Sequence, residues 1–238
     1  MPAAKKLSIL IPVYNERHTI RRVVEAAANA PLPPGVDREL IVIDDGSVDG
    51  TEAVLHTIPR GISYHLFRSE RNQGKGSAIR AGIPHAKGDF ILIQDGDLEY
   101  DVSAYEAIVR PLLESKARVV YGSRFLGTIE SMAWPYRVVN RLLVAWTNFL
   151  YGTSLTDEAT AYKAFDAELL RGLKLKARRF EFCPEVTGKI SRLGIPIHEV
   201  PVKYLGRTRE QGKKIRWYDA ITAFWVLLRE RVIPRNRG

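Results

Sequence analysis

The sequence is poor in cysteine and has no long apolar run. Cys183 is the only cysteine among 238 residues, which excludes an internal disulfide and a zinc site built on cysteines, so we expect it to serve in packing. No apolar stretch approaches the roughly 20 residues that a membrane-spanning helix needs. The first residues, MPAAKK, lead into an apolar segment without the pattern of a signal peptide. We therefore expect no integral anchor and a cytoplasmic location.

The glycine-rich signatures of two common nucleotide-binding folds are also missing. No Gly-x-Gly-x-x-Gly follows the first apolar segment, and the sequence contains no Gly-x-x-x-x-Gly-Lys-Ser/Thr. These absences exclude the usual dehydrogenase and P-loop schemes. A sheet that binds a nucleotide here must do so in another way.

The composition is that of a globular protein with an uneven positive charge. Hydrophobic residues make up 45% and charged residues 26% of the chain, which is long enough for one large domain. The net charge is +9, and residues 203–238 hold ten Lys and Arg against three acidic residues. Such a basic segment indicates an anionic partner, which can be a lipid headgroup, a nucleic acid or a phosphorylated substrate.

The amino-terminal half alternates apolar runs with helical patterns. We expect strands at 7–13, 40–43, 62–67 and 90–94, and a helix at 78–86. This alternation predicts an α/β fold with a mostly parallel central sheet flanked by helices. In such a sheet, the polar segments that follow successive strands meet along one edge, where ligands bind.

In the stretch FILIQDGDLEYD at residues 90–101, the first three acidic residues, Asp95, Asp97 and Glu99, occupy alternate positions. If the strand continues in extended form, their side chains point the same way. Clustered carboxylates suit Mg²⁺ or Mn²⁺, which keep exchangeable waters for substrate phosphates. The alternative is an ordinary strand followed by an acidic turn.

Four segments in order resemble the successive motifs of family 2 inverting glycosyltransferases. They are SILIPVYNE at 8–16, DDGSVDGT at 44–51, NQGKG at 72–76 and QDGDLEY at 94–100. Within that family, the chain is similar to the polyprenyl-phosphate hexosyltransferases along nearly its whole length. The resemblance implies an A-type glycosyltransferase fold.

The resemblance also implies roles for residues in the amino-terminal half. Those that bind the nucleotide-sugar donor would be Pro12, Tyr14, Glu16, Asp44, Lys75 and Asp95, and those that hold Mg²⁺ or Mn²⁺ would be Asp95, Asp97 and Glu99. Taken singly, several have simpler explanations. Glu16 suits the first turn of a helix, and Lys75 could be a solvated loop charge.

The resemblance implies that the carboxyl-terminal half supplies the acceptor side. We expect a strand at 119–125 that ends at Arg124, and the resemblance implies that Arg124 and Arg137 contact an acceptor phosphate. Guanidinium stays charged and offers a fork of donors that fits phosphate oxygens. Residues 134–151 read either as an amphipathic helix at a membrane surface, which we favour, or as a core helix with arginines turned outward.

Further candidates follow in TDEATAYK, residues 156–163, where we expect Asp157 to face the cleft. With Asp97, Arg124 and Arg137 it completes the catalytic residues that we expect. The basic segment 207–214 resembles a loop that closes over donor and acceptor phosphates, with Arg207 and Lys213 as the candidates. A final amphipathic helix is expected at 218–232.

These observations divide the chain into a catalytic domain at 1–204 and a basic lid loop with an amphipathic helix at 205–238. The donor half would end near residue 122, and the acceptor half would span about 123–204.

The expected reaction is metal-dependent transfer of a hexose from GDP-mannose or UDP-glucose to a dolichyl or undecaprenyl phosphate. The enzyme would lie peripherally on the cytoplasmic face of an anionic membrane. A phosphate monoester is largely ionised at neutral pH, so this acceptor needs no strong base.

Three alternatives remain open. The acceptor could be a soluble glycan or a glycerolipid, in which case Asp157 is the natural base. The chain could bind a nucleotide sugar without catalysis. The basic segment could bind nucleic acid, but no recognised nucleic-acid module is present, so none is expected.

Overall fold

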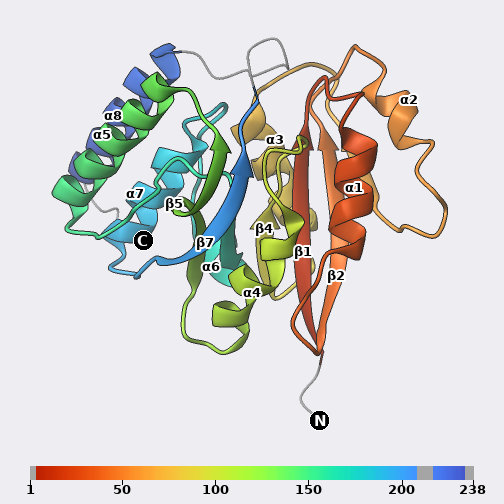
Figure 1. Ribbon diagram of the computed structural model, residues 1–238, viewed down its shortest axis with the longest axis horizontal. Coiled ribbons are helices and arrows are strands. Elements are labelled where there is room, and N and C mark those ends of the chain that lie inside the picture. The colour runs from red at the N-terminus through yellow and green to blue at the C-terminus, as the bar shows by residue number, and fades with distance from the viewer. Residues whose placement is uncertain (1–3, 208–216, 234–238) are drawn as a thin grey trace.

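The computed structural model describes residues 4–207 and 217–233, and Lys213 lies outside them. Seven strands form one sheet in the order β3-β2-β1-β4-β6-β5-β7 (Figure 1). The neighbouring strands are parallel except where β6 pairs with β4 and β5. The expected α/β fold is confirmed. The strands are β1 (Lys5–Val13), β2 (Val36–Asp44), β3 (His65–Arg68), β4 (Phe90–Ile93), β5 (Val119–Ser131), β6 (Lys163–Asp166) and β7 (His198–Leu205).

Helices cover both faces of this sheet (Figure 1). Helices α1 (Ile20–Asn29) and α4 (Tyr105–Leu113) pack on one face, and α3 (Lys75–Gly82), α6 (Ala167–Gly172) and α7 (Phe182–Arg192) on the other. The short helix α2 (Thr51–Leu55) follows β2, and two 3-10 turns span Ile83–His85 and Val102–Ala104. Helices α5 (Trp134–Tyr151) and α8 (Trp217–Val232) pack together beside α7. Within the described part of the chain, no helix is long and apolar enough to span a membrane.

Burial on both faces explains the continuous apolar strands. Ile9 and Ile11 of β1 face the cluster with α1 and α4, whereas Leu10 between them faces the cluster with α3 and α7. Each of these side chains is fully buried, which stabilises the fold by about 1.5–3 kcal/mol per residue. The central strands are therefore apolar throughout, as parallel strands covered on both sides are.

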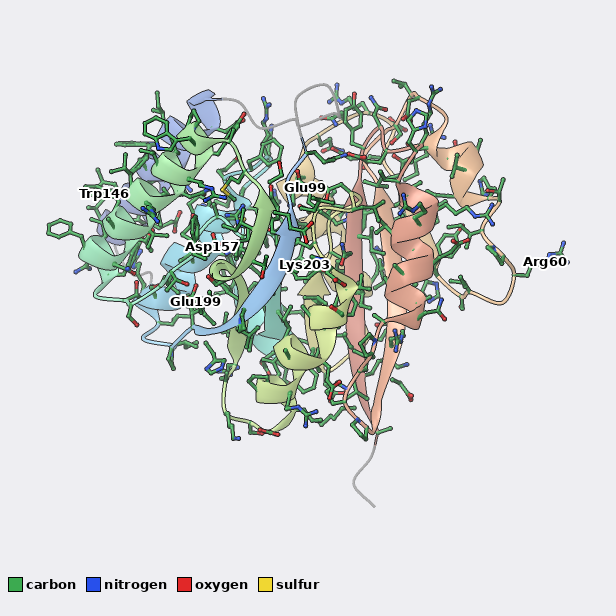
Figure 2. The ribbon with its side chains drawn as sticks, in the orientation of Figure 1. Arg60, Glu99, Trp146, Asp157, Glu199 and Lys203 are labelled. Carbon is green, nitrogen blue, oxygen red and sulfur yellow. The ribbon has the colours of Figure 1, made fainter. Side chains whose placement is uncertain are left out.

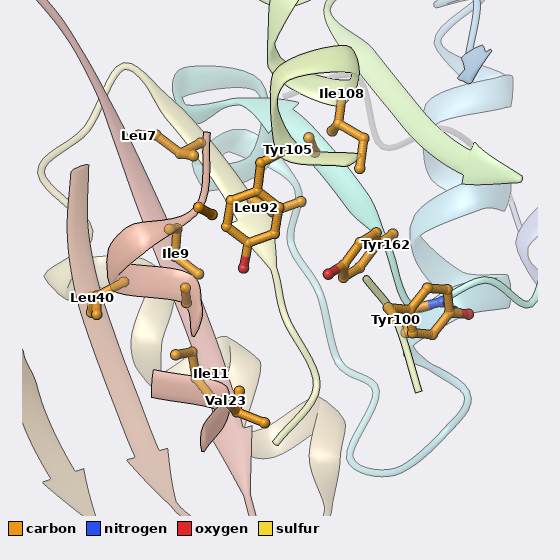
Figure 3. Packing of buried hydrophobic residues seen from close by; sticks show 14 of the residues in the cluster. Leu7, Ile9, Ile11, Val23, Leu40, Leu92, Tyr100, Tyr105, Ile108 and Tyr162 are labelled. Atoms are coloured by element: carbon orange, nitrogen blue, oxygen red, sulfur yellow. Dashed lines mark hydrogen bonds between the residues drawn. The ribbon is translucent and has the colours of Figure 1, made fainter. Parts of the chain in front are cut away.

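A polar anchor fixes the point at which β4 ends. The hydroxyl groups of Tyr105 and Tyr162 both donate to Oε1 of Gln94, each over 2.7 Å. Both tyrosines lie in the buried cluster beside Leu92 of β4 (Figure 3). Gln94 is thereby held in the core, and the chain leaves the sheet directly after it.

Several boundaries differ from the sequence predictions. The third strand is His65–Arg68 rather than 62–67, and the helix expected at 78–86 is α3 followed by a 3-10 turn that contains Pro84. Strand β5 continues to Ser131 because its far end pairs with β7 after a register shift. Strand β4 ends at Ile93, before the acidic residues that were expected to continue it.

Candidate functional site

A cleft of about 1760 Å³ opens at the carboxyl edge of the sheet. Its walls come from both halves of the chain, including the end of β1, the turn after β4, the start of α3, and parts of β5, α5, α7, β7 and α8. The sequence candidates that line it are Pro12, Tyr14, Glu16, Lys75, Asp95, Asp97, Glu99, Arg124 and Arg207. Three others, Asp44, Arg137 and Asp157, do not line it.

The acidic residues reach the cleft through a turn and not through strand alternation. The Asp97 carboxylate accepts a hydrogen bond from the Glu99 backbone N–H over 3.1 Å, and Thr19 Oγ1 donates to the Gly96 carbonyl over 2.9 Å. A Cβ at Gly96 would lie 3.2 Å from Val13, so the turn packs tightly on the end of β1. The parity argument was therefore wrong about the backbone, although the three residues do line one cleft.

Two basic side chains neutralise this acidic turn. Lys75, at the start of α3, forms an ion pair with Asp95. The Arg207 guanidinium donates to Asp97 over 2.7 Å and to Glu16 over 3.0 Å. Burial and the charges of Asp95 and Glu99 raise the pKa of Asp97 to about 7, and Arg207 opposes that rise.

In the described part of the chain, no group of three or more His, Cys, Asp or Glu residues has its side chains arranged to hold a metal ion. The donor set itself is suitable, because Asp95 and Asp97 offer hard carboxylate oxygens on the wall of the cleft. Glu99 differs from them. Its Oε2 accepts from the Tyr204 hydroxyl over 2.9 Å, and its Oε1 accepts from the Arg207 N–H over 2.8 Å. Glu99 thus holds the end of β7 against the acidic turn.

The loops that follow β2 and β3 are tied together at the cleft. Asp45 lines the cleft, and its carboxylate accepts hydrogen bonds from the N–H groups of Gln73 and Gly74 over 3.0 and 2.7 Å. Burial raises the pKa of Asp45 more than these bonds lower it. Asp44 is fully buried behind this loop, where its Oδ1 accepts from the Ser47 N–H over 2.9 Å. The residue that reaches the cleft is therefore the second aspartate of the pair, which the sequence did not single out.

A buried ion pair joins Arg124 of β5 to Asp157. The guanidinium donates to both carboxylate oxygens, each over 2.7 Å, and the Arg124 N–H donates to Oδ2 over 3.0 Å. Glu199 holds the Asp157 backbone N–H over 2.9 Å. Burial lowers the pKa of Arg124, but Asp157 more than offsets this and keeps it well above its usual value.

The expectation that Asp157 faces the cleft was wrong. Its side chain is fully buried behind Arg124, and both of its oxygens are engaged. Figure 2 shows Asp157 between the sheet and helix α5, away from Glu99. In this position it orients the arginine that does line the cleft.

Arg137 is not brought to the cleft either. Helix α5 begins at Trp134, and its cleft side carries Tyr136, Val139, Asn140 and Leu143, which share one helical face. Arg137 falls on the exposed side of the same helix. Helical periodicity therefore separates it from Arg124.

Tyr204 and Glu158 also line the cleft, and the sequence reasoning missed both. Tyr204 is the last buried residue in the alternating pattern of β7, and this alternation could have indicated that its side chain points inward. Glu158 follows Asp157 and gave no signal of its own. It is fully buried, and within the described residues neither of its carboxylate oxygens has a hydrogen-bond partner of acceptable geometry. Burial raises the pKa of Glu158, and the nearby Lys163 ammonium only partly opposes this.

Beyond Arg124 the wall of the cleft becomes largely apolar. Side chains from the segment before α5 and from α5, α7 and α8 enclose this part. They include Met132, Val139, Leu143, Phe182 and Ala223. The cleft therefore joins a charged end to an apolar end.

Comparison with known proteins places the chain in a family. Residues 8–173 match the model of glycosyl transferase family 2. A relative from Edwardsiella ictaluri, named undecaprenyl-phosphate 4-deoxy-4-formamido-L-arabinose transferase, is 28% identical over 87% of this chain and 62% of its own length. Another from Rhizobium johnstonii, named dodecaprenyl-phosphate galacturonate synthase, is 29% identical over 94% of this chain and 64% of its own. The chain thus spans a little under two thirds of these relatives.

Solved structures show the same fold. Glucosyl-3-phosphoglycerate synthase from Mycobacterium tuberculosis, in complex with Mn²⁺, UDP and glucosyl-3-phosphoglycerate, superposes with a TM-score of 0.73 at 23% identity, covering 98% of this chain and 82% of that one. The complex of the same enzyme with Mg²⁺ and UDP superposes with a TM-score of 0.71, covering 98% of this chain and 82% of that one. The A-type fold implied by the sequence motifs is confirmed. The match over residues 8–173 shows that the chain belongs to glycosyl transferase family 2.

Proposed function

We propose that this protein transfers a hexose from a nucleotide sugar to a polyprenyl phosphate, with inversion at the anomeric carbon. The observation that carries the proposal is the continuity of the cleft, which runs from the acidic turn past Arg124 to an apolar end between α5, α7 and α8. A charged end suits a nucleoside diphosphate, and an apolar end suits a lipid tail. The names of the two relatives, both transferases or synthases of polyprenyl-phosphate sugars, support the same class of acceptor.

At the donor end, Pro12, Tyr14 and Glu16 line the part of the cleft next to Asp45 and would surround the nucleoside. Asp95 and Asp97 would hold Mg²⁺ or Mn²⁺, which supplies positive charge against the diphosphate when bound. Lys75 and Arg207, which now neutralise these carboxylates, would then be available to the phosphate oxygens. Glu99 has less support as a ligand contact because both of its oxygens accept hydrogen bonds within the protein, and Asp44 has less support because it is fully buried and does not line the cleft.

At the acceptor end, Arg124 would bind and orient the phosphate of the lipid. An ionised phosphate oxygen attacks the anomeric carbon while the bond from that carbon to the diphosphate oxygen breaks, and the nucleoside diphosphate departs with its electrons. No protein base is required. The buried pairing of Asp157 with Arg124 supports this, because it leaves Asp157 no free oxygen to take a proton from a sugar hydroxyl.

The surface of α5 and α8 supports contact with a membrane. Large apolar side chains are exposed on one side of each helix, at seven- or eight-residue spacing on α5 and at four- or seven-residue spacing on α8. Arg137 and Arg141 are exposed beside the α5 stripe. This arrangement fits a peripheral protein on an anionic, cytoplasmic membrane face. The apolar residues are Trp134, Leu142 and Phe149 on α5 and Ile221, Trp225 and Val232 on α8.

The proposal is tested in two steps. A set of UDP-, GDP- and other nucleotide sugars is screened for thermal stabilisation with Mg²⁺ or Mn²⁺, and the best donor is then assayed for transfer to a short polyprenyl phosphate. Sugar transfer to the prenyl phosphate, lost on adding chelator, is the expected result. Transfer only to a soluble glycan or to phosphoglycerate would overturn the acceptor assignment. Donor binding without transfer to any acceptor would indicate a binding protein.

A further inference from the structure

We propose that Tyr204 is a positioning residue that holds Arg124 at the acceptor end and Arg207 at the donor end with opposite parts of one side chain. The inference rests on the proposed function, because it takes these two arginines as the groups that meet acceptor and donor phosphates. Tyr204 itself is not assigned a contact with the reacting atoms.

The hydroxyl group serves the donor end. It donates to Glu99 Oε2 over 2.9 Å, and the other oxygen of the same carboxylate accepts from the Arg207 N–H over 2.8 Å. The backbone reinforces this contact, since the Leu205 N–H donates to the Glu99 carbonyl over 2.8 Å. Arg207 thus enters the cleft from an anchor made by Tyr204 and Glu99, and its guanidinium reaches Asp97 from there.

The ring serves the acceptor end. The Cζ atom of Arg124 lies 5.2 Å from the centroid of the Tyr204 ring, within the range of a cation–π contact. Asp157 holds the same guanidinium through its Nε and one terminal nitrogen. Arg124 is therefore fixed by a carboxylate on its fork and by an aromatic ring, and it keeps its place beside the cleft.

Neighbouring aromatic rings keep Tyr204 in this orientation. Tyr204 is 2% exposed and packs edge-on against Tyr100, with ring centroids 5.1 Å apart. Tyr100 in turn stacks on Tyr162 at 4.5 Å, as Figure 3 shows from within the core. A ring held in this way cannot turn without disturbing the core, so both of its contacts are rigid.

Two substitutions separate the two roles. Tyr204→Phe keeps the aromatic ring beside Arg124 but removes the hydroxyl that donates a hydrogen bond to Glu99. It should therefore weaken binding of the nucleotide sugar only. Tyr204→Leu removes both the ring and the hydroxyl, so it should weaken donor and acceptor binding together. Tyr64→Phe is the matched control, because it removes a partly buried tyrosine hydroxyl that donates to the Leu55 carbonyl over 2.7 Å, and Tyr64 does not line the cleft.

The experiment measures KM for donor and acceptor and kcat in the wild type and the three variants, with thermal unfolding as a check on folding. We expect the donor KM to rise about three- to tenfold in both Tyr204 variants. The acceptor KM should rise by a similar factor in Tyr204→Leu and stay unchanged in Tyr204→Phe. The control should change neither KM. If Tyr204→Leu does not fold, Tyr204→Met provides the second aliphatic variant.

Equal acceptor KM values in Tyr204→Leu and the wild type would overturn the ring's role, and an unchanged donor KM in Tyr204→Phe would overturn that of the hydroxyl. Equilibrium binding of UDP with Mn²⁺ and of farnesyl phosphate to the same variants keeps this test separate from the proposed reaction. If the wild type binds both but transfers nothing, the proposed function fails. The positioning role is then judged only from the affinities of the variants for UDP with Mn²⁺ and for farnesyl phosphate.

Discussion

Arg207 donates a hydrogen bond to Asp97 over 2.7 Å, although 110 residues separate them in the chain. The same guanidinium donates to Glu16, which follows β1. A basic residue from the end of the sheet therefore occupies the position beside the acidic turn where a cation is expected when donor is bound. If Asp97 holds a metal ion as proposed, Arg207 would compete with that ion for the carboxylate.

Removing that competition should favour metal binding in the absence of donor. We expect Arg207→Gln to bind free Mn²⁺ several-fold more tightly than the wild type, because hydrogen bonds to a charged group contribute about 1.5–3 kcal/mol each. Calorimetric titration with Mn²⁺ measures this. Arg21→Gln, which removes an exposed arginine paired with Glu25 on α1, is the control and should change nothing. Weaker binding of Mn²⁺ to Arg207→Gln would contradict the competition.

The pair formed by Arg124 and Asp157 should be essential for stability. Asp157→Ala leaves a buried guanidinium without its partner, and we expect it to lower the free energy of unfolding by about 3–5 kcal/mol. Urea denaturation measures this change. Lys5→Ala, which breaks an exposed ion pair with Asp89, should cost less than about 1 kcal/mol.

The same pair distinguishes an orienting role of Asp157 from a role as a base. In the milder variant Asp157→Asn, we expect the acceptor KM to rise while the pH dependence of kcat keeps its shape, because a displaced Arg124 binds phosphate less well. A lost acid limb in the kcat profile with an unchanged acceptor KM would instead identify Asp157 as a base.

Glu158 should make stability depend on pH. Burial raises its pKa in the folded protein above the value of about 4.3 that a Glu carboxyl has in an unfolded chain. The folded state then binds more protons than the unfolded state, so rising pH lowers the free energy of unfolding through this group. We expect Glu158→Gln to be more stable than the wild type at pH 8.5, with the difference shrinking as the pH falls towards 4.5. Urea midpoints at several pH values test this, and a difference that does not vary with pH would contradict it.

The apolar stripes on α5 and α8 should govern binding to vesicles. Phe149 is 79% exposed, and inserting its ring into a bilayer surface should contribute about 1.5–3 kcal/mol. We expect Phe149→Ser to weaken the affinity for phosphatidylglycerol vesicles, measured by co-sedimentation, by about tenfold or more. Val48→Ser is the control, because Val48 is 84% exposed on the loop after β2. Equal effects of the two substitutions would count against these helices as the membrane-binding surface.

Much of the fold could be predicted from local pattern. Apolar runs separated by helical segments indicated a mostly parallel sheet, because strands buried on both faces must be apolar throughout. The polar motifs after β1, β2 and β4 were expected to meet, since parallel strands end at one edge of a sheet. Pro12, Tyr14, Asp95 and Asp97 do lie together in one cleft for this reason.

Local pattern was insufficient where a side chain's surroundings come from distant segments. Asp157 and Arg137 were both expected in the cleft, but the partner of Asp157 is set by the position of β5, and the face of Arg137 by the residue at which α5 begins. The three acidic residues converge through a turn that Gln94 initiates, and its anchors, Tyr105 and Tyr162, are held by tertiary packing.

The sequence by itself determined the order in which strands and helices follow one another along the chain, and it determined the family. It also determined which acidic and basic groups are available for chemistry, because all of these depend on residue type and spacing. The tertiary structure alone decided which of those charges meet. Arg207 reaches Asp97, and Tyr204 lies between Glu99 and Arg124, only because β7 pairs at its end with the segment that follows β4. Contacts between segments so far apart depend on the register of the sheet, which no local pattern contains.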